Sequence, residues 1–255
     1  MNPHSAKTKF IKLGVLIMAA VTLAGMAGCS QRVPDVSGQV EQKLEAKYHE
    51  KFSVSKVYGG SLVPTNVFAD TYKLICYPEN NPNLKFKAEL SPNGVFFDEY
   101  VSANVNVKVE KLISDALHKK FQNVAVKSIT VGDYVKSSDT TLSIENYLLE
   151  DKTNGFVIYV LIQTDKTKAN DIYNILQSTM KSVNNFSAAT YCFCVDYEDF
   201  ESGKKVFENN MDIEPKDFEK QYKSIEDASF KFENNSTGIT PDIFANEFDK
   251  KGKWD

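Results

Sequence analysis

The chain has 255 residues, of which 42% are hydrophobic and 12% aromatic, with 17 phenylalanines among them. This is enough apolar material for a packed core, so the composition excludes disorder over most of the length. The formal net charge of −4 at pH 7 argues against nucleic acid as a partner and against a polybasic contact with anionic lipid.

Residues 1–28 are predicted to be an export signal. Lys7, Lys9 and Lys12 form a basic start without an acid, and residues 13–26 carry no charge. This run of 14 residues is shorter than the roughly 20 that a transmembrane helix needs. Removal of the signal would leave about 227 residues with a net charge near −7, which fits one large domain or two small ones.

The signal ends in Met26-Ala27-Gly28-Cys29. This tetrapeptide resembles the lipobox of bacterial lipoproteins, in which a cysteine receives a diacylglycerol before signal peptidase II cuts on its N-terminal side. The resemblance implies lipid attachment at Cys29 and cleavage between Gly28 and Cys29, although Met26 stands where that family most often has leucine. The alternatives are an ordinary secretory signal cut after Ala27 and an uncleaved anchor.

A lipid on Cys29 makes the membrane the first expected partner of this chain. Two acyl chains hold a protein stably at a bilayer, whereas a single chain holds it only marginally. We therefore expect the protein on the extracytoplasmic face of the cell membrane. Residues 29–38, which include Pro34 and Gly38, are predicted to be a short tether.

The first folded half is predicted over residues 39–135. Apolar residues at helical spacing indicate a helix over 40–52. Alternating and turn-bounded apolar runs then indicate a meander of strands at 52–58, 70–77 and 84–90.

Asp98 is predicted to cap a long second helix, and residues 123–131 are predicted to form the strand after it. The helix carries an apolar stripe typical of packing against a sheet. The stripe consists of Val101, Val105, Val109, Leu112, Ala116 and Leu117.

The second half is predicted over residues 136–200, again as strand, helix and strand, at 155–164, 165–183 and 188–197. The expected buried face of this helix is Ala169, Ile172, Tyr173, Leu176 and Met180. The predicted class is therefore α+β, with two successive β-α-β-containing halves whose helices pack on antiparallel or mixed sheets.

Residues 201–255 are predicted to be a helical or irregular C-terminal segment. They contain two similar stretches, 207–218 and 232–244, which share Phe-Glu-Asn-Asn and then Ile-x-Pro-x-x-Phe. We expect chance or simple structural reuse, with duplicated docking elements as the alternative.

Three cysteines follow Cys29, at positions 76, 192 and 194. Cys192 and Cys194 are two apart in a predicted strand, so their side chains share a face at a spacing near the upper limit for a disulfide. We expect free buried thiols. The alternatives are a bridge from Cys76 to one of the other two, and a metal or redox site.

No catalytic set, metal site or cofactor motif is predicted. His49 and His118 are expected at the surface, where either could act as a base only beside a nucleophile. The acidic group Asp196, Glu198, Asp199 and Glu201 is expected to be a solvated edge that prevents strand aggregation rather than a cation site. Four aromatic residues are candidate contact groups, with core packing as the alternative: Tyr58, Phe96, Phe97 and Tyr100.

Residues 41–120 contain the stretches KYHEKF and NNPNLKF, and an Asp-x-Tyr before the long helix. This pattern resembles uncharacterised lipoproteins of low-GC Gram-positive bacteria, and it implies a location rather than an activity. We therefore expect a non-enzymatic, lipid-anchored binding or interaction domain with an unknown protein or small-molecule ligand. The alternatives are a hydrolase acting on envelope material, a peptide pheromone cut from the signal, and a structural role in the envelope.

Overall fold

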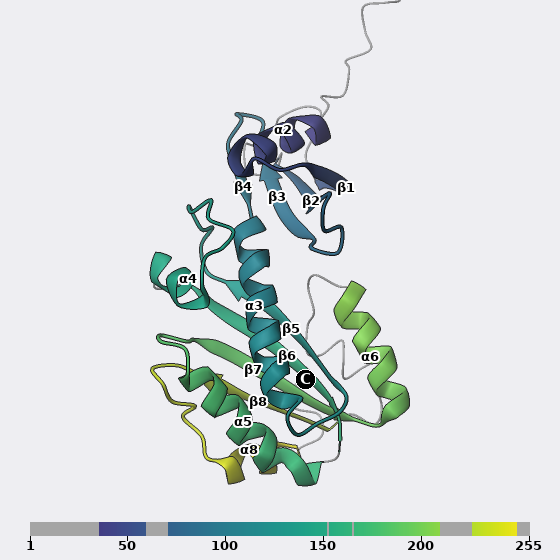
Figure 1. The fold of residues 1–255 in the computed structure, drawn as a ribbon, viewed down its shortest axis with the longest axis vertical. Coiled ribbons are helices and arrows are strands. Elements are labelled where there is room, and N and C mark those ends of the chain that lie inside the picture. Colours follow the sequence, from purple (N-terminus) through teal and green to yellow (C-terminus); the bar gives the residue numbers. More distant parts are fainter. Residues whose placement is uncertain (1–35, 60–70, 152, 165, 210–225, 249–255) are drawn as a thin grey trace, which may run out of the picture. The chain divides into compact units, whose positions relative to one another are not determined.

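The computed structural model describes residues 36–59, 71–151, 153–164, 166–209 and 226–248. The fold is α+β, as predicted, with two four-stranded sheets and helices packed on them (Figure 1). The predicted signal and Cys29 lie outside the described residues. None of the described helices is both long enough and apolar enough to cross a bilayer.

The first sheet is an antiparallel meander in the order β1 (Phe52–Gly59), β2 (Tyr72–Pro78), β3 (Phe86–Leu90) and β4 (Phe96–Asp98). Helix α2 (Val36–Tyr48) contributes apolar side chains to the core of this sheet. The helix begins inside the range expected for the tether and ends four residues earlier than predicted. It ends there because His49 takes a left-handed backbone conformation with φ of 59°.

The core of the first sheet is built around four aromatic rings. Tyr48, Phe52, Phe86 and Tyr100 have neighbouring ring centroids 4.9 to 5.9 Å apart, several of them edge to face. Such pairs are worth about 0.5–1.5 kcal/mol each beyond the area that they bury.

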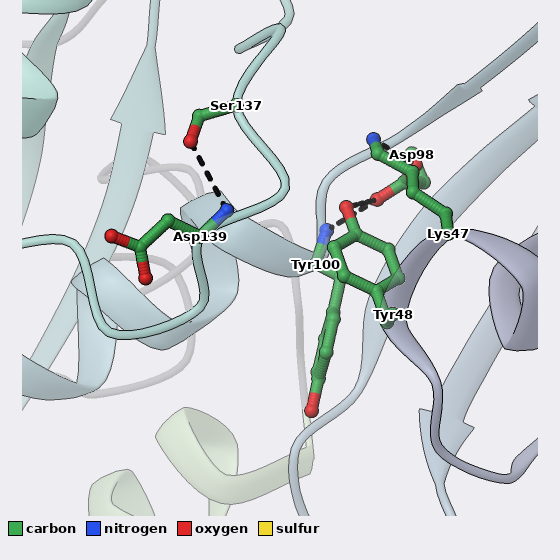
Figure 2. Close-up of polar contacts among 6 residues, drawn as sticks. All are labelled: Lys47, Tyr48, Asp98, Tyr100, Ser137 and Asp139. Carbon is green, nitrogen blue, oxygen red and sulfur yellow. Dashed lines mark hydrogen bonds and ion pairs between the residues drawn. The ribbon is translucent and has the colours of Figure 1, made fainter.

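Asp98 connects α2 to the start of helix α3 (Tyr100–Leu117), as Figure 2 shows. Its carboxylate accepts hydrogen bonds from the Lys47 ammonium at 2.8 Å, the Tyr48 hydroxyl at 2.5 Å and the Tyr100 backbone N–H at 3.2 Å. The predicted cap is thus one residue off, because Glu99 is the N-cap. Asp98 is only 6% exposed, so these hydrogen bonds replace the contacts with water that its carboxylate loses on burial.

Helix α3 is shared by two cores. Tyr100 belongs to the core of the first sheet, whereas the later stripe belongs to the core of the second. Val101, Val105, Val109 and Leu117 are buried as predicted. The predicted Leu112 and Ala116 are only partly buried, and Ile113 is fully buried in their place, because the stripe continues in steps of four.

The second sheet is mixed, in the order β5 (Val124–Val131), β6 (Gly155–Gln163), β7 (Ala188–Val195) and β8 (Glu226–Phe232). Strands β6 and β7 are parallel and are joined through helix α5 (Ala169–Lys181), and the other pairs are antiparallel. All five residues predicted for the buried face of α5 are buried. Strand β5 was expected to belong to the first half, but it pairs with β6 of the second. The C-terminal segment was expected to be helical or irregular, but it contributes the strand β8 to the same sheet.

Both faces of the second sheet are covered, which explains the almost uninterrupted apolar run of β6. One face packs against α3, α5, α4 (Ile144–Glu150) and α8 (Pro241–Glu247) (Figure 1). The other face packs against Phe200 and Phe207 of α6 (Tyr197–Asn209). Before α4, the connector folds locally, with the Asp139 N–H donating to the Ser137 hydroxyl at 3.1 Å (Figure 2).

The two Phe-Glu-Asn-Asn stretches do not share a structure. Phe207 lies in α6, whereas Phe232 ends β8 and is followed by Asn234 and Asn235 in the left-handed region. Pro241 does begin α8, after the cap Thr240, but the corresponding Pro215 lies outside the described residues. The expectation of structural reuse is therefore wrong for the first three residues of the tetrapeptide, which are described in both copies.

The face of α3 that packs on the sheet can be tested with neighbouring residues. We expect Ile113→Ala to lower the free energy of unfolding by about 2–5 kcal/mol, because it opens a cavity in a fully buried site. Leu112→Ala is the matched control and should cost less than half as much. Denaturant unfolding of both variants measures the difference, and equal losses would contradict this orientation of α3.

Candidate binding groove

The three described cysteines are free and buried, as predicted. Cys76 lies in the core of the first sheet, whereas Cys192 and Cys194 lie in the core of the second. The alternative prediction, a disulfide between Cys76 and Cys192 or Cys194, is therefore wrong. Burial raises the pKa of the Cys76 thiol to about 12 and also raises the pKa of Cys192, so both stay protonated at neutral pH.

The two histidines lie apart from each other, at the ends of different helices. His49 follows α2 and is exposed, and His118 follows α3, is exposed and has its Nδ1 atom 3.3 Å from the Phe121 carbonyl oxygen. Neither residue lines either of the cavities described below. The hydrolase hypothesis requires one of these histidines in a concave site, and neither of these two cavities contains one.

The acidic group after β7 begins a helix. The Asp196 carboxylate accepts the Asp199 N–H at 3.0 Å, and Glu198 and Asp199 occupy the first turn of α6, where the helix dipole favours negative charge. These acidic residues were predicted to protect a sheet edge from aggregation. That prediction is wrong, because they follow β7, which lies inside the sheet between β6 and β8. The described part of the chain holds no group of three or more His, Cys, Asp or Glu side chains placed to hold a metal ion.

The four candidate aromatic residues divide between core and surface. Tyr100 is buried in the core of the first sheet, and Phe96 packs against that core. Phe97 is 44% exposed and stacks on Tyr134, with ring centroids 4.9 Å apart. Tyr58 is half-buried, with the Lys56 ammonium 5.7 Å from its ring centroid. Core packing is thus the main role of two of the four.

The strongest candidate site is a groove along β5, formed by two adjoining cavities of about 340 and 670 Å³. Both are lined by Asn83 and Lys85 from the segment before β3, Glu110 from α3, and Lys127 from β5. The smaller cavity continues along α3 past Ser102 and Asn106, and the larger one reaches Lys204, Phe207 and Glu208 of α6. We call the two cavities together the β5 groove.

Strand β5 stands at the end of its sheet, so one of its edges faces this groove. Among the described residues, β6 is the only strand that pairs with β5. Residues 124–130 of β5 all line one or both cavities. The groove therefore follows a strand edge rather than a sheet face.

Glu110 lies where the two cavities meet. Its carboxylate accepts the backbone N–H of Ser128 at 2.9 Å and lies 3.8 Å from the Lys127 ammonium. The Ser128 hydroxyl in turn donates to the side-chain oxygen of Asn106 at 3.0 Å. Burial raises the pKa of Glu110, while Lys127 and the Ser128 N–H partly oppose that rise.

Three lysines line the larger cavity, against two carboxylates, those of Glu110 and Glu208. Lys85, from the segment before β3, and Lys204, from α6, are exposed and have no carboxylate partner among the described residues. Lys127 lines the same cavity, and its ammonium lies 3.8 Å from the Glu110 carboxylate. The cavity is therefore suited to a negatively charged group, although the chain as a whole is acidic.

This groove was not predicted from the sequence, although part of its polar lining follows a regular pattern. Ser102, Asn106 and Glu110 recur at intervals of four on α3, which is a polar stripe beside the apolar one. Lys127 and Ser128 interrupt an otherwise apolar strand. The periodicity could have indicated a polar face on α3, but not that β5 would lie against it.

No family model matches this chain, and no curated protein matches it. Among solved structures, it is similar to a DUF5037 family protein from Ruminococcus gnavus ATCC 29149, with a TM-score of 0.65 and 16% sequence identity. The match covers 85% of this chain and all of the other chain. At this identity the likeness supports a shared fold alone.

The electrostatics of Glu110 lead to a pH-dependent prediction. Because the pKa of Glu110 is raised in the folded state, its charge is penalised at pH 7, and Glu110→Gln should raise the free energy of unfolding there. As the pH falls through about 4.5, the folded wild type takes up its proton before the unfolded chain does, so this advantage should disappear.

Denaturant unfolding of both proteins between pH 3 and 7 measures this difference. Glu110→Ala is the control: it leaves the Ser128 N–H without its acceptor and should cost about 1–2 kcal/mol at pH 7. If Glu110→Gln cost as much as the alanine variant at pH 7, burial would not be the dominant influence on this carboxylate.

Proposed function

We propose that this chain is a lipid-anchored protein of the extracytoplasmic face of the cell membrane, and that it binds a partner non-enzymatically through the β5 groove. The observation that carries the binding role is the groove itself, where four lysines and three glutamates line the edge of β5 that does not pair with β6. Pockets with a few convergent polar groups are the usual sites of recognition.

The proposed anchor is supported by the lipobox-like Met26-Ala27-Gly28-Cys29 and by the short apolar run before it. Helix α2 begins only seven residues after Cys29, at Val36. An extended segment of that length spans at most about 25 Å. A lipid on Cys29 would therefore hold the folded part close to the bilayer surface.

The first test concerns the anchor. We expect Cys29→Ala to abolish incorporation of a labelled fatty acid and to slow removal of the signal, because the acceptor thiol is lost. Cys76→Ala is the matched control, since it also removes one cysteine but leaves Cys29 intact. Labelling of Cys29→Ala at the wild-type level would overturn the proposed anchor.

The second test concerns the groove. A photo-crosslinking residue at Asn83 or Lys204, which face the groove, should give the same discrete product in intact cells. The same residue at Leu149, which is 67% exposed on α4 and outside the groove, is the control and should not give it. Equal products from all three positions, or none from the groove positions, would overturn the proposed binding site.

A further inference from the structure

We propose that the β5 groove binds an extended peptide with acidic side chains, which pairs through its backbone with the open edge of β5 at Val124 and Val126. This inference rests on the proposed function, in which the groove is the binding site, and adds the chemical class of the partner. Addition of a peptide strand to a sheet edge is an established mode of recognition.

The backbone geometry of β5 identifies the available groups. The Asn123 carbonyl accepts the Gln163 N–H at 3.1 Å, so odd-numbered positions of β5 direct their backbone groups to β6. Even-numbered positions direct theirs away from β6, and the Ser128 N–H accordingly points to Glu110. Val124 and Val126 share this outward direction, and their N–H groups have no hydrogen-bond partner among the described residues.

The Glu110 carboxylate sets the end of the open edge. It accepts the hydrogen bond from the Ser128 N–H that the carbonyl of a neighbouring strand would otherwise accept. A peptide can therefore pair with Val124 and Val126 without displacing a hydrogen bond among the described residues, whereas pairing at Ser128 would break a charge-assisted bond. This assigns the peptide to the larger cavity, which Val124, Ala125, Val126 and Lys127 line.

The charges of the larger cavity identify the side chains of the peptide. Side chains on a strand next to β5 project alternately to the two faces of the sheet. Lys204 lies on α6, which packs on one face, and Lys85 lies on the segment before β3. Both ammonium groups lack a carboxylate partner among the described residues, so Asp or Glu side chains on the peptide would supply one.

A second copy of this chain is a poorer occupant of the same edge. Strand β5 has the sequence Val-Ala-Val-Lys-Ser-Ile-Thr-Val, which contains a lysine and no acid. Edge-to-edge pairing of two copies would give the lysine of β5 no acid on the added strand, whereas an acidic peptide supplies one, and opposite charges on paired strands are stabilising.

The first experiment measures the binding of synthetic peptides to the full chain, purified from membranes in detergent, by fluorescence anisotropy. The probes are seven-residue peptides that alternate valine with glutamate, with glutamine or with lysine. We expect the glutamate peptide to bind at least tenfold more tightly than the other two. Binding of none of the three, or equal binding of all three, would overturn the proposal.

N-methylation of the glutamate peptide tests the backbone pairing. Methyl groups on every second backbone nitrogen block one edge of the peptide and leave the other edge intact. We expect one of the two alternate methylation patterns to abolish binding and the other to preserve it, because only one edge faces β5. Equal binding of both patterns would overturn strand addition.

Protein variants test the edge itself. Val126→Pro removes an N–H that points away from β6, a position where a strand edge tolerates proline. It should weaken binding of the glutamate peptide at least tenfold, whereas Val126→Ala controls for the lost side chain and should change it less than threefold. Lys204→Glu should also weaken binding tenfold, but its neighbour Lys205→Glu, which does not line the cavity, should not.

Amide hydrogen exchange on the wild type keeps the test decisive if Val126→Pro fails to fold. Peptide binding should slow exchange of the Val124 and Val126 amides, and unchanged exchange at both would overturn the pairing. Concentration-dependent dimerisation through β5, seen by sedimentation, would favour a second copy and overturn the peptide. If the peptide experiments fail but the groove positions still crosslink and Cys29 is still labelled, the acidic-peptide proposal is wrong and the proposed function is retained.

Discussion

Helix α3 is the element on which the rest of the structure depends, because it has to satisfy two cores at once. Its first residue, Tyr100, packs among the aromatic rings of the first sheet, and the stripe from Val101 to Leu117 packs on the second. A displacement of its N-terminus would disturb both cores, and protein interiors tolerate little change in packing. Asp98 opposes such a displacement by holding Lys47, Tyr48 and the Tyr100 N–H together.

The same helix creates the β5 groove. Its apolar stripe determines how it lies on the second sheet, and the polar side chains of Asn106 and Glu110 then both meet Ser128 in the middle of β5. Glu110 uses this position to cover one backbone group of an open strand edge. Exposed edges invite pairing with other chains, and natural proteins cover or charge them for that reason. The described residues cover this edge only in part, which makes Val124 and Val126 a candidate stretch for selective recognition.

Much of the fold followed from local patterns. The alternation in residues 72–90 predicted the meander, and the helical period of residues 169–180 predicted every buried side chain of α5. Errors arose where two patterns overlapped. Leu112 and Ile113 are both apolar and adjacent, so the sequence could not say which of them faces the sheet. Residues 207–209 of the first Phe-Glu-Asn-Asn end a helix, whereas the second copy begins at the end of a strand and continues into a turn.

By itself, the sequence determined the α+β class, the positions of most elements and the lipobox-like motif at Cys29, because these depend on periodicity and on short contiguous stretches. Only the tertiary structure decided that β5 belongs to the second sheet, that Cys76 is separated from Cys192 and Cys194, and that Glu110 meets Ser128. These facts depend on strand pairing between residues that are distant in the chain. Local propensity carries no information about such pairing, since the interactions that select it form only when the whole core is assembled.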